Sequence, residues 1–250
     1  MRDQRHRDRL KLLAATCLFK RGAPVALSFD PEALPVIGID HDLPAVSLHR
    51  LSAAAVRHRF AQPPRWQPEI AREPRFFERA PAAASVLVPL VLRQELMVLF
   101  TQRTDHLNDH PGQISFPGGR VEPGDADATA TALREAEEEV GLPRSFVDVL
   151  GSLPEYTTGT GFVVTPVVAL IRPGFTPRPD PFEVAEVFEV PLSFLMNPGN
   201  HRRHAVEFGG VRREFLSMPW QGDGPHGPRR YFIWGATAAM LRNLYRFMIA

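Results

Sequence analysis

The chain has 250 residues, which fits one large domain or one domain with a substantial extension. Its hydrophobic fraction of 44% and charged fraction of 23% are ordinary for a globular protein, and its net charge of +1 gives no overall field that would attract nucleic acid or an acidic membrane. No apolar run reaches the roughly 20 residues of a membrane-spanning helix, so we expect neither a nucleic-acid nor a membrane partner.

Residues 1–80 show no sustained hydrophobic period, and we interpret them as an N-terminal extension that precedes or wraps the main domain. Residues 1–27 predict an amphipathic helix and not a secretion signal, because Lys20 and Arg21 stand where a cleavage region would be small and neutral. Cys17 is the single cysteine and cannot form a disulfide within the chain, which favours a reducing, cytoplasmic location. We expect three aromatic residues to anchor the extension on apolar surface: Trp66, Phe76 and Phe77.

Beyond the extension, short apolar runs rich in β-branched residues predict strands. In chain order these runs cover residues 84–92, 96–103, 113–116, 146–153, 162–171 and 186–192. The turn "RQE" joins the first two, and residues 204–218 predict a further hairpin with Gly209 and Gly210 at its turn. Residues 231–249 predict a closing helix, because apolar residues recur there at helical spacing. Together these elements predict an α+β fold of mixed sheets with helices on the outside.

The stretch "FPGGRVEPGDADATATALREAEEEVGL" predicts a helix that carries a cluster of glutamates. At about 100° per residue, Glu135, Glu138 and Glu139 share one face of this helix, while Glu137 lies on the far side. The opposite face carries a core stripe of Thr129, Leu133, Ala136 and Val140.

The ends of this helix are also marked in the sequence. Asp125 or Asp127 can cap its N-terminus, and Gly141 is well placed as the left-handed residue after its C-terminus. Before the helix, the adjacent glycines Gly118 and Gly119 let the backbone approach a ligand closely or adopt a positive φ.

The three carboxylates on one face indicate either a solvated acidic surface or a site for a hard cation. Mg²⁺ and Mn²⁺ prefer oxygen ligands, and Mg²⁺ is bound by one or two carboxylates together with substrate phosphates. The helix by itself does not decide between these interpretations. The glycine pair before it favours the cation.

From Gly119 onward the sequence resembles the Nudix box, G-x5-E-x7-R-E-U-x-E-E-x-G-U, in which U is aliphatic. The part "REAEEEVGL" matches the second half of the box. The spacing from Gly119 to Arg134 is one residue longer than the usual pattern, and Ala126 aligns with the usual first glutamate. Asp125 or Glu122 can take the place of that glutamate as the partner of Arg134.

A narrower resemblance is to the coenzyme A pyrophosphatase subgroup of the Nudix hydrolase superfamily. Residues 99–119 are similar to the segment that precedes the box in this subgroup, which also tolerates the longer loop, and residues 153–168 are similar to the segment that follows. This resemblance implies a Nudix-type α/β/α sandwich with mixed β-sheets over residues 81–250. It also implies Mg²⁺- or Mn²⁺-dependent hydrolysis of the pyrophosphate bond in coenzyme A or acyl-CoA, giving 3′,5′-ADP and 4′-phosphopantetheine or its acyl form.

The resemblance further implies roles for individual residues. Glu135 and Glu139 would be the principal metal ligands, Glu138 would complete the cluster, and Gly119 would contribute a backbone carbonyl. Arg134 would orient the carboxylates. The candidates for substrate binding are Arg103, Gln113, Ser115 and Gly118. Nudix enzymes often use a later acid as a ligand or base, for which the candidates are Glu183, Glu186 and Glu189, with Glu186 as the first choice.

Two alternatives stay open. The same catalytic core can act on ADP-ribose, NADH, a dinucleotide or an oxidised nucleoside triphosphate. A second alternative is a Nudix-like module that senses a nucleotide without cutting it, although such modules typically lose the box glutamates that this chain retains. The extension leaves room for a regulatory or homodimer-forming role in each case.

Overall fold

The computed structural model describes residues 30–75, 80–105, 112–208, 210–224 and 227–250, and Pro31–Ala250 form one compact unit. The helix predicted for residues 1–27 lies outside the described residues, and so do Cys17, Phe76 and Phe77. Within the described part, none of the helices combines the length and the apolarity needed to cross a membrane.

The larger sheet has eight strands. They are β2 (Ala82–Leu92), β3 (Leu96–Arg103), β4 (Ile114–Ser115), β5 (Gly118–Arg120), β6 (Val147–Ser152), β7 (Tyr156–Thr157), β8 (Phe162–Ile171) and β9 (Val184–Pro191). The main order is β4-β3-β2-β8-β6, with β5 on β2, β7 on β8 and β9 on β3. The β2 and β8 strands pair in parallel, while the other pairs are antiparallel, so the predicted mixed sheet is confirmed.

The smaller sheet has four antiparallel strands in the order β1-β10-β11-β12. They are β1 (Val36–Ile39), β10 (Arg202–Phe208), β11 (Val211–Gly224) and β12 (Gly227–Trp234). The hairpin predicted for residues 204–218 is confirmed: Phe208 pairs with Val211, and Gly210 has a φ of 73° at the turn. A left-handed residue at this position explains why the sequence has glycine there.

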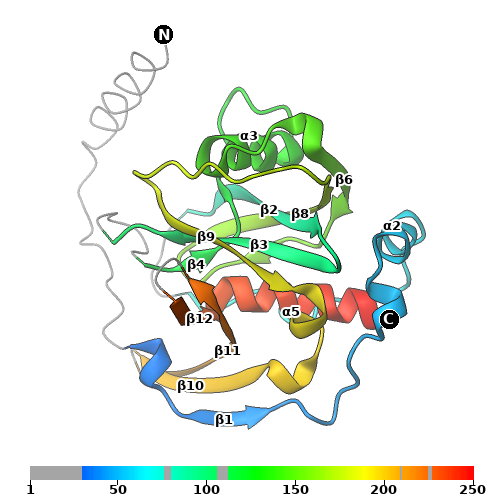
Figure 1. Cartoon of the computed structure of the whole chain (residues 1–250). Coiled ribbons are helices and arrows are strands. Elements are labelled where there is room, and N and C mark those ends of the chain that lie inside the picture. The colour runs from blue at the N-terminus through cyan, green and yellow to red at the C-terminus, as the bar shows by residue number, and fades with distance from the viewer. Residues whose placement is uncertain (1–29, 76–79, 106–111, 209, 225–226) are drawn as a thin grey trace, which may run out of the picture. The chain divides into compact units, whose positions relative to one another are not determined.

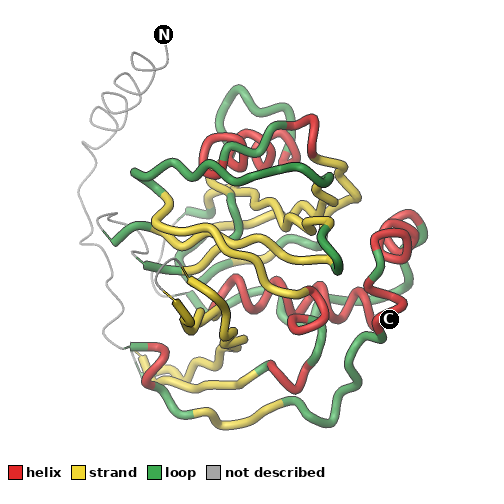
Figure 2. Tube along the Cα trace, in the orientation of Figure 1, coloured by secondary structure: helices red, strands yellow, loops and turns green. Residues whose placement is uncertain are grey.

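The helices are α2 (Ala53–Ala61), α3 (Ala128–Val140), α4 (Leu192–Leu195) and α5 (Gly235–Ile249). Short 3₁₀ turns occur at η1 (Pro31–Ala33), η2 (Leu48–Leu51), η3 (Arg144–Phe146) and η4 (Pro198–Asn200). Figure 1 shows α3 on one face of the larger sheet and α5 on the other, between the two sheets. Figure 2 shows the same layers, with the strands in yellow and the helices in red.

The closing helix differs from the prediction in two ways. It begins at Gly235, because Tyr231 and Ile233 are buried alternately with their neighbours as part of β12, which pairs with β11. It also does not lie on the outside: residues 237–245 are all buried. Contacts with a sheet on either side account for this burial, and local periodicity could not reveal the second sheet.

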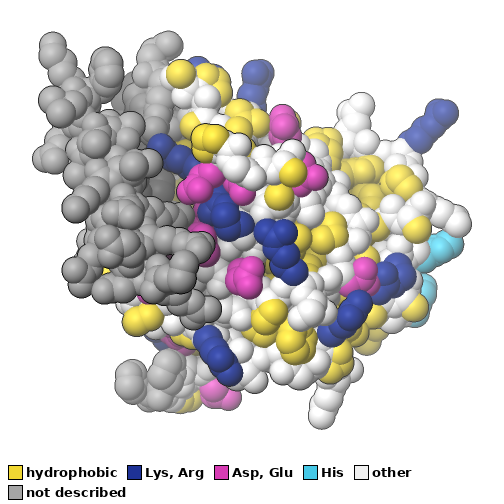
Figure 3. Space-filling model, turned by 90° about the horizontal axis from the view of Figure 1, so that it is seen from above, with side chains coloured by type: hydrophobic (Ala, Val, Ile, Leu, Met, Phe, Trp, Pro, Cys, Tyr) yellow, Lys and Arg dark blue, Asp and Glu magenta, His cyan; other side chains and the backbone are white. Residues whose placement is uncertain are grey.

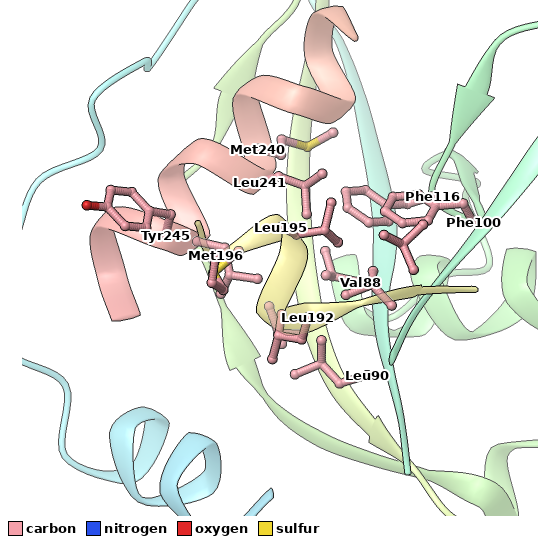
Figure 4. Close-up of a cluster of buried hydrophobic side chains, with 14 of the residues drawn as sticks. Val88, Leu90, Phe100, Phe116, Leu192, Leu195, Met196, Met240, Leu241 and Tyr245 are labelled. Carbon is pink, nitrogen blue, oxygen red and sulfur yellow. The ribbon is translucent and has the colours of Figure 1, made fainter. Parts of the chain in front are cut away.

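Two hydrophobic clusters fill the spaces between the layers. The smaller cluster packs Ala132, Ala136 and Val140 of α3 against the larger sheet. The larger cluster joins the other face of that sheet to α4 and α5, and Figure 4 shows Val88 and Phe100 of the sheet beside side chains of those helices. Helix α3, which carries the predicted metal ligands, therefore packs on a sheet that has a hydrophobic cluster on each face.

Residues 31–75 belong to the same compact unit as the remainder of the described chain. Val46, Leu51 and Val56 are buried in the larger cluster. The ring of Trp66 lies 5.2 Å from that of Phe247 in α5, which confirms the predicted anchoring role of Trp66. The sequence did not predict α2, because Val56 is its one buried residue and no apolar stripe marks it.

Candidate active site

Helix α3 is fixed at both ends by the residues that the sequence indicated. The Oδ1 atom of Asp127 accepts a hydrogen bond of 2.7 Å from the backbone N–H of Ala130. At the other end Gly141 has a φ of 65°, and the backbone N–H of Leu142 donates to the carbonyl of Ala136 at 3.2 Å. The N–H of Gly141 also donates to the carbonyl of Glu137 at 3.1 Å, which makes this an αL-type helix end that sets where the glutamates of the helix lie.

The four glutamates of α3 occupy three different environments. Glu135 and Glu139 are buried, with exposed fractions of 8% and 4%. Glu138 is exposed beside them, and Glu137 is exposed as its helical angle predicts. The glutamate face thus consists of a buried pair with a third carboxylate at the solvent boundary.

Gly118 and Gly119 do not form a turn but belong to β5, which pairs with β2. A Cβ atom on Gly118 would lie 2.5 Å from the carbonyl oxygen of Ser85, and one on Gly119 would lie 2.5 Å from the Cδ and Oε1 atoms of Glu135. The role of these glycines is close approach: they allow the backbone of β5 to lie directly against the carboxylate of Glu135.

Glu139 has a raised pKa because it is buried beside a second carboxylate. Burial, and then the nearby charge of Glu135, raise the pKa of Glu139 to about 8. The charge of Arg103 and a hydrogen bond from the backbone N–H of Gly118 act in the opposite direction, while Glu183 adds to the increase in pKa. Two buried carboxylates this close favour either a retained proton or a bound cation.

Arg134 holds the carboxylates in place through all five of its N–H groups. Its Nε and Nη2 atoms donate to the two carboxylate oxygens of Asp125, each at 3.0 Å. Nη1 donates to Glu135 at 2.8 Å and to Glu138 at 3.2 Å, and Nη2 also donates to the carbonyl of Arg120 at 3.1 Å. The guanidinium therefore ties two glutamates of α3 to β5 and to the preceding loop.

Asp125 is the partner of Arg134. The sequence had left the choice open between Asp125 and Glu122. The carboxylate of Glu122 lies farther away, at 4.0 Å from Nη1. The guanidinium of Arg134, with further hydrogen bonds from Glu122 N–H and the Thr131 hydroxyl, holds the pKa of Asp125 far below its usual range. The longer loop thus supplies an acid from the position before Ala126.

The donors of this site fit a divalent metal ion. Among the described residues, no group of three His, Cys, Asp or Glu side chains is already gathered around one point. The buried pair of Glu135 and Glu139 supplies the one or two carboxylates that Mg²⁺ requires, and the backbone of Gly119 lies against Glu135. A cation would also relieve the repulsion that raises the pKa of Glu139.

Other predicted site residues lie at the end of β3 and in β4. The backbone N–H of Arg103 donates to the carbonyl of Gln113 at 2.9 Å. The hydroxyl of Ser115 lies 3.3 Å from that of Thr101 on the paired strand. Of these residues, Arg103 is the one whose charge acts on Glu139.

Glu186 is not brought to the buried pair. It shares a face of β9 with Phe188 and Val190, which belong to the larger cluster on the side away from α3. Its carboxylate accepts hydrogen bonds from the hydroxyl of Tyr231 at 2.5 Å and from Arg229 at 2.7 Å. Glu183, just before β9, is the acid of that segment whose charge reaches Glu139.

The surface above the larger sheet carries charges of both signs. Seen from above, acidic and basic side chains lie next to one another on this face (Figure 3).

Comparisons with known proteins identify the family of this chain. The sequence model of the NUDIX domain matches residues 81–208. The uncharacterized Nudix hydrolase NudL of Shigella flexneri serotype 5b is 42% identical over 181 residues, which are 71% of this chain and 86% of the relative. NudL of Escherichia coli K12 is 44% identical over 164 residues, 64% of this chain and 80% of the relative. A solved Ap4A hydrolase from C. elegans has 20% identity and a TM-score of 0.38, over 44% of this chain and 80% of that one.

The helix with the buried carboxylate pair lies within the residues that the NUDIX domain model matches. The chain belongs to the NUDIX domain family, and it is a Nudix hydrolase. Enzymes of this family hydrolyse diphosphate linkages of nucleotide derivatives and generally use divalent metal ions such as Mg²⁺ or Mn²⁺.

Proposed function

We propose that this chain hydrolyses the pyrophosphate bond of coenzyme A or acyl-CoA with Mg²⁺ or Mn²⁺. The products are 3′,5′-ADP and 4′-phosphopantetheine or its acyl form. The observation that carries the hydrolytic part is the buried pair of Glu135 and Glu139 beside Gly119. Support for the coenzyme A part comes from the resemblance of residues 99–119 to the segment that precedes the box in the coenzyme A pyrophosphatases.

Each residue has a part in this proposal that follows from its contacts. Glu135 and Glu139 hold the metal ion, which when bound neutralises charge on the diphosphate and activates water. Arg134 keeps Glu135 and Glu138 oriented, since its Nη1 atom donates to both. Arg103 binds a phosphate oxygen in this proposal, which is supported by the action of its charge on the carboxylate of Glu139.

The substrate is tested by a mass-spectrometric panel. Purified protein is incubated with coenzyme A, acyl-CoA, ADP-ribose, NADH and nucleoside triphosphates, with Mg²⁺ or Mn²⁺ and after chelation. We expect 3′,5′-ADP from coenzyme A in the presence of either metal, and no product after chelation. Cleavage of another nucleotide while coenzyme A and acyl-CoA stay intact would refute the substrate.

Turnover is tested by Glu139→Gln, with Glu137→Gln as the matched control on the same helix. Glu139→Gln removes a buried ligand but keeps its size, so we expect substrate binding to persist and kcat to fall about 100-fold or more. Glu137 is exposed, so its variant should keep wild-type activity. If Glu139→Gln turned over substrate as fast as the control, a nucleotide-sensing module would be the better interpretation.

A further inference from the structure

A groove between β9 and the β11–β12 hairpin lies apart from the carboxylate site. Its volume is about 480 Å³, within the range of small-molecule sites. It is lined by residues 187–189 of β9, residues 220–223 of β11, and Pro228 and Tyr231 of β12. One edge of β9 pairs with β3. The groove runs along β9 where the larger sheet meets the β11–β12 hairpin.

Aromatic rings form the apolar part of the groove. The rings of Phe188 and Tyr231 stack at 3.9 Å and are buried at its base, while Trp220 is half-buried, edge-on to Phe194 at 4.7 Å. A Cβ atom on Gly222 would lie 2.6 Å from Nε1 of Trp220. The glycine therefore leaves the room in which the indole lies along the groove wall.

The acidic side chains in the lining disfavour a phosphate, and the neutral polar groups there suit an amide-bearing group. Among the described residues that line the groove, the two charged side chains are acidic, Glu189 and Asp223, and none is lysine, arginine or histidine. Glu189 is already paired with Arg93 through hydrogen bonds of 3.0 and 2.7 Å. The Gln221 amide and the Trp220 indole N–H remain as groups that can bond amides.

The distance along the chain from the carboxylate pair to the groove matches the length of one substrate arm. The backbone N–H of Asp180 donates to the carbonyl of Glu139 at 2.9 Å, and that of Glu183 donates to the carbonyl of Asp180 at 3.1 Å, so the chain just before β9 lies beside the end of α3 that carries the carboxylate pair. Val187, four residues after Glu183, packs against the cluster beneath α3 and also lines the groove. Four extended residues span about 13 Å. The pantetheine arm has as many chain bonds as the backbone of about four residues.

We propose that this groove binds the pantetheine arm of the substrate, with Trp220 as its accessible aromatic wall. This inference rests on the proposed function, because the arm belongs to coenzyme A. The amides of the arm bond to the polar lining, its apolar parts lie against the indole of Trp220, and the acidic lining disfavours the diphosphate.

The test compares Trp220→Ala with Trp234→Ala, a half-buried tryptophan of β12 outside the groove. In Trp220→Ala we expect KM for coenzyme A to rise about tenfold, since one wall of the arm site is removed. The inhibition constant of 3′,5′-ADP, which lacks the arm, should stay within about twofold of wild type. Trp234→Ala should change neither quantity. Gly222→Ala, which crowds the indole without removing buried atoms, should reproduce the Trp220→Ala pattern even if Trp220→Ala does not fold.

Binding of pantetheine itself separates this inference from the proposed function. Saturation-transfer NMR should detect pantetheine on the wild type and on Trp234→Ala, and not on Trp220→Ala. If KM for coenzyme A and the inhibition constant of 3′,5′-ADP rise together, the groove holds the nucleotide half and the inference is wrong. The same conclusion follows if pantetheine binds equally to all three proteins. Failure of the wild type to cleave coenzyme A would instead overturn the proposed function, whichever way pantetheine binds.

Discussion

Replacement of Asp125 by alanine tests whether the longer loop carries the structural partner of Arg134. The Asp125 carboxylate is 6% exposed and accepts four hydrogen bonds, two of them from the guanidinium. Single hydrogen bonds contribute about 0.5–1.5 kcal/mol, and those to charged groups more, but neighbours in one network do not add. Arg134 would keep its bonds to Glu135, Glu138 and Arg120, so its charge would not be left alone. We therefore expect Asp125→Ala to lower the free energy of unfolding by about 2–3 kcal/mol.

The matched control for Asp125→Ala is Asp127→Ala, which removes the same charge two residues away. Asp127 caps α3 through one hydrogen bond to Ala130, so its loss should cost about 1 kcal/mol. Urea unfolding measures both values, and metal-dependent hydrolysis measures activity. We expect at least a tenfold loss of kcat in Asp125→Ala, because Glu135 and Glu138 lose their fixed orientation, and a smaller effect in the control. Equal unfolding midpoints and equal rates in the two variants would refute the role of Asp125.

Two further predictions concern Gly119 and Glu69. In Gly119→Ala the new Cβ would lie 2.5 Å from the carboxylate of Glu135, so activity should fall at least about tenfold. The control is Gly124→Ala, whose new Cβ would have nothing within 4 Å and which should stay active. Equal steady-state rates in the two variants would contradict this role of Gly119. Burial opposes ionisation of Glu69, but hydrogen bonds from Arg242, Arg246 and Arg203 outweigh it and lower its pKa from 4.5 to about 2. The stabilisation is therefore present above pH 4.5 and is lost as the pH falls towards about 2. Urea unfolding should show a gap between wild type and Glu69→Gln that is wider at pH 7 than at pH 3, and an equal gap would count against the ion pairs.

The extension shows why some of the fold could not be predicted. Glu69 bonds Arg242, which is fully buried in α5, and the pair joins residues 173 positions apart in the chain. An arginine in a helix reads as a solvent-facing residue from sequence alone, because arginine is rarely buried without a partner. The partner here comes from a segment without local periodicity, so neither member indicates the other.

Helix α3 could be predicted from the sequence, because the residues that define it are close together in the chain. Asp127 and Gly141 fix its ends through hydrogen bonds within a few residues, and the helical period alone separates Glu137 from the other glutamates. The strand pattern was equally local: the run predicted for residues 162–171 is β8 with the same limits. These features depend on neighbours along the chain, which the sequence displays directly.

The sequence by itself therefore determined helix α3, long strands such as β8 and the spacing of the glutamates of α3, because caps and periodicity act over a few residues. Only the tertiary structure decided which carboxylates are buried together, since the burial of Glu135 and Glu139 depends on β5 and the larger sheet. It also decided that Asp125 meets Arg134, and that Glu186 faces Tyr231 on the other side of the sheet. The physical reason is the same in each case: these contacts join residues that are not adjacent along the chain, and burial and charge act through space.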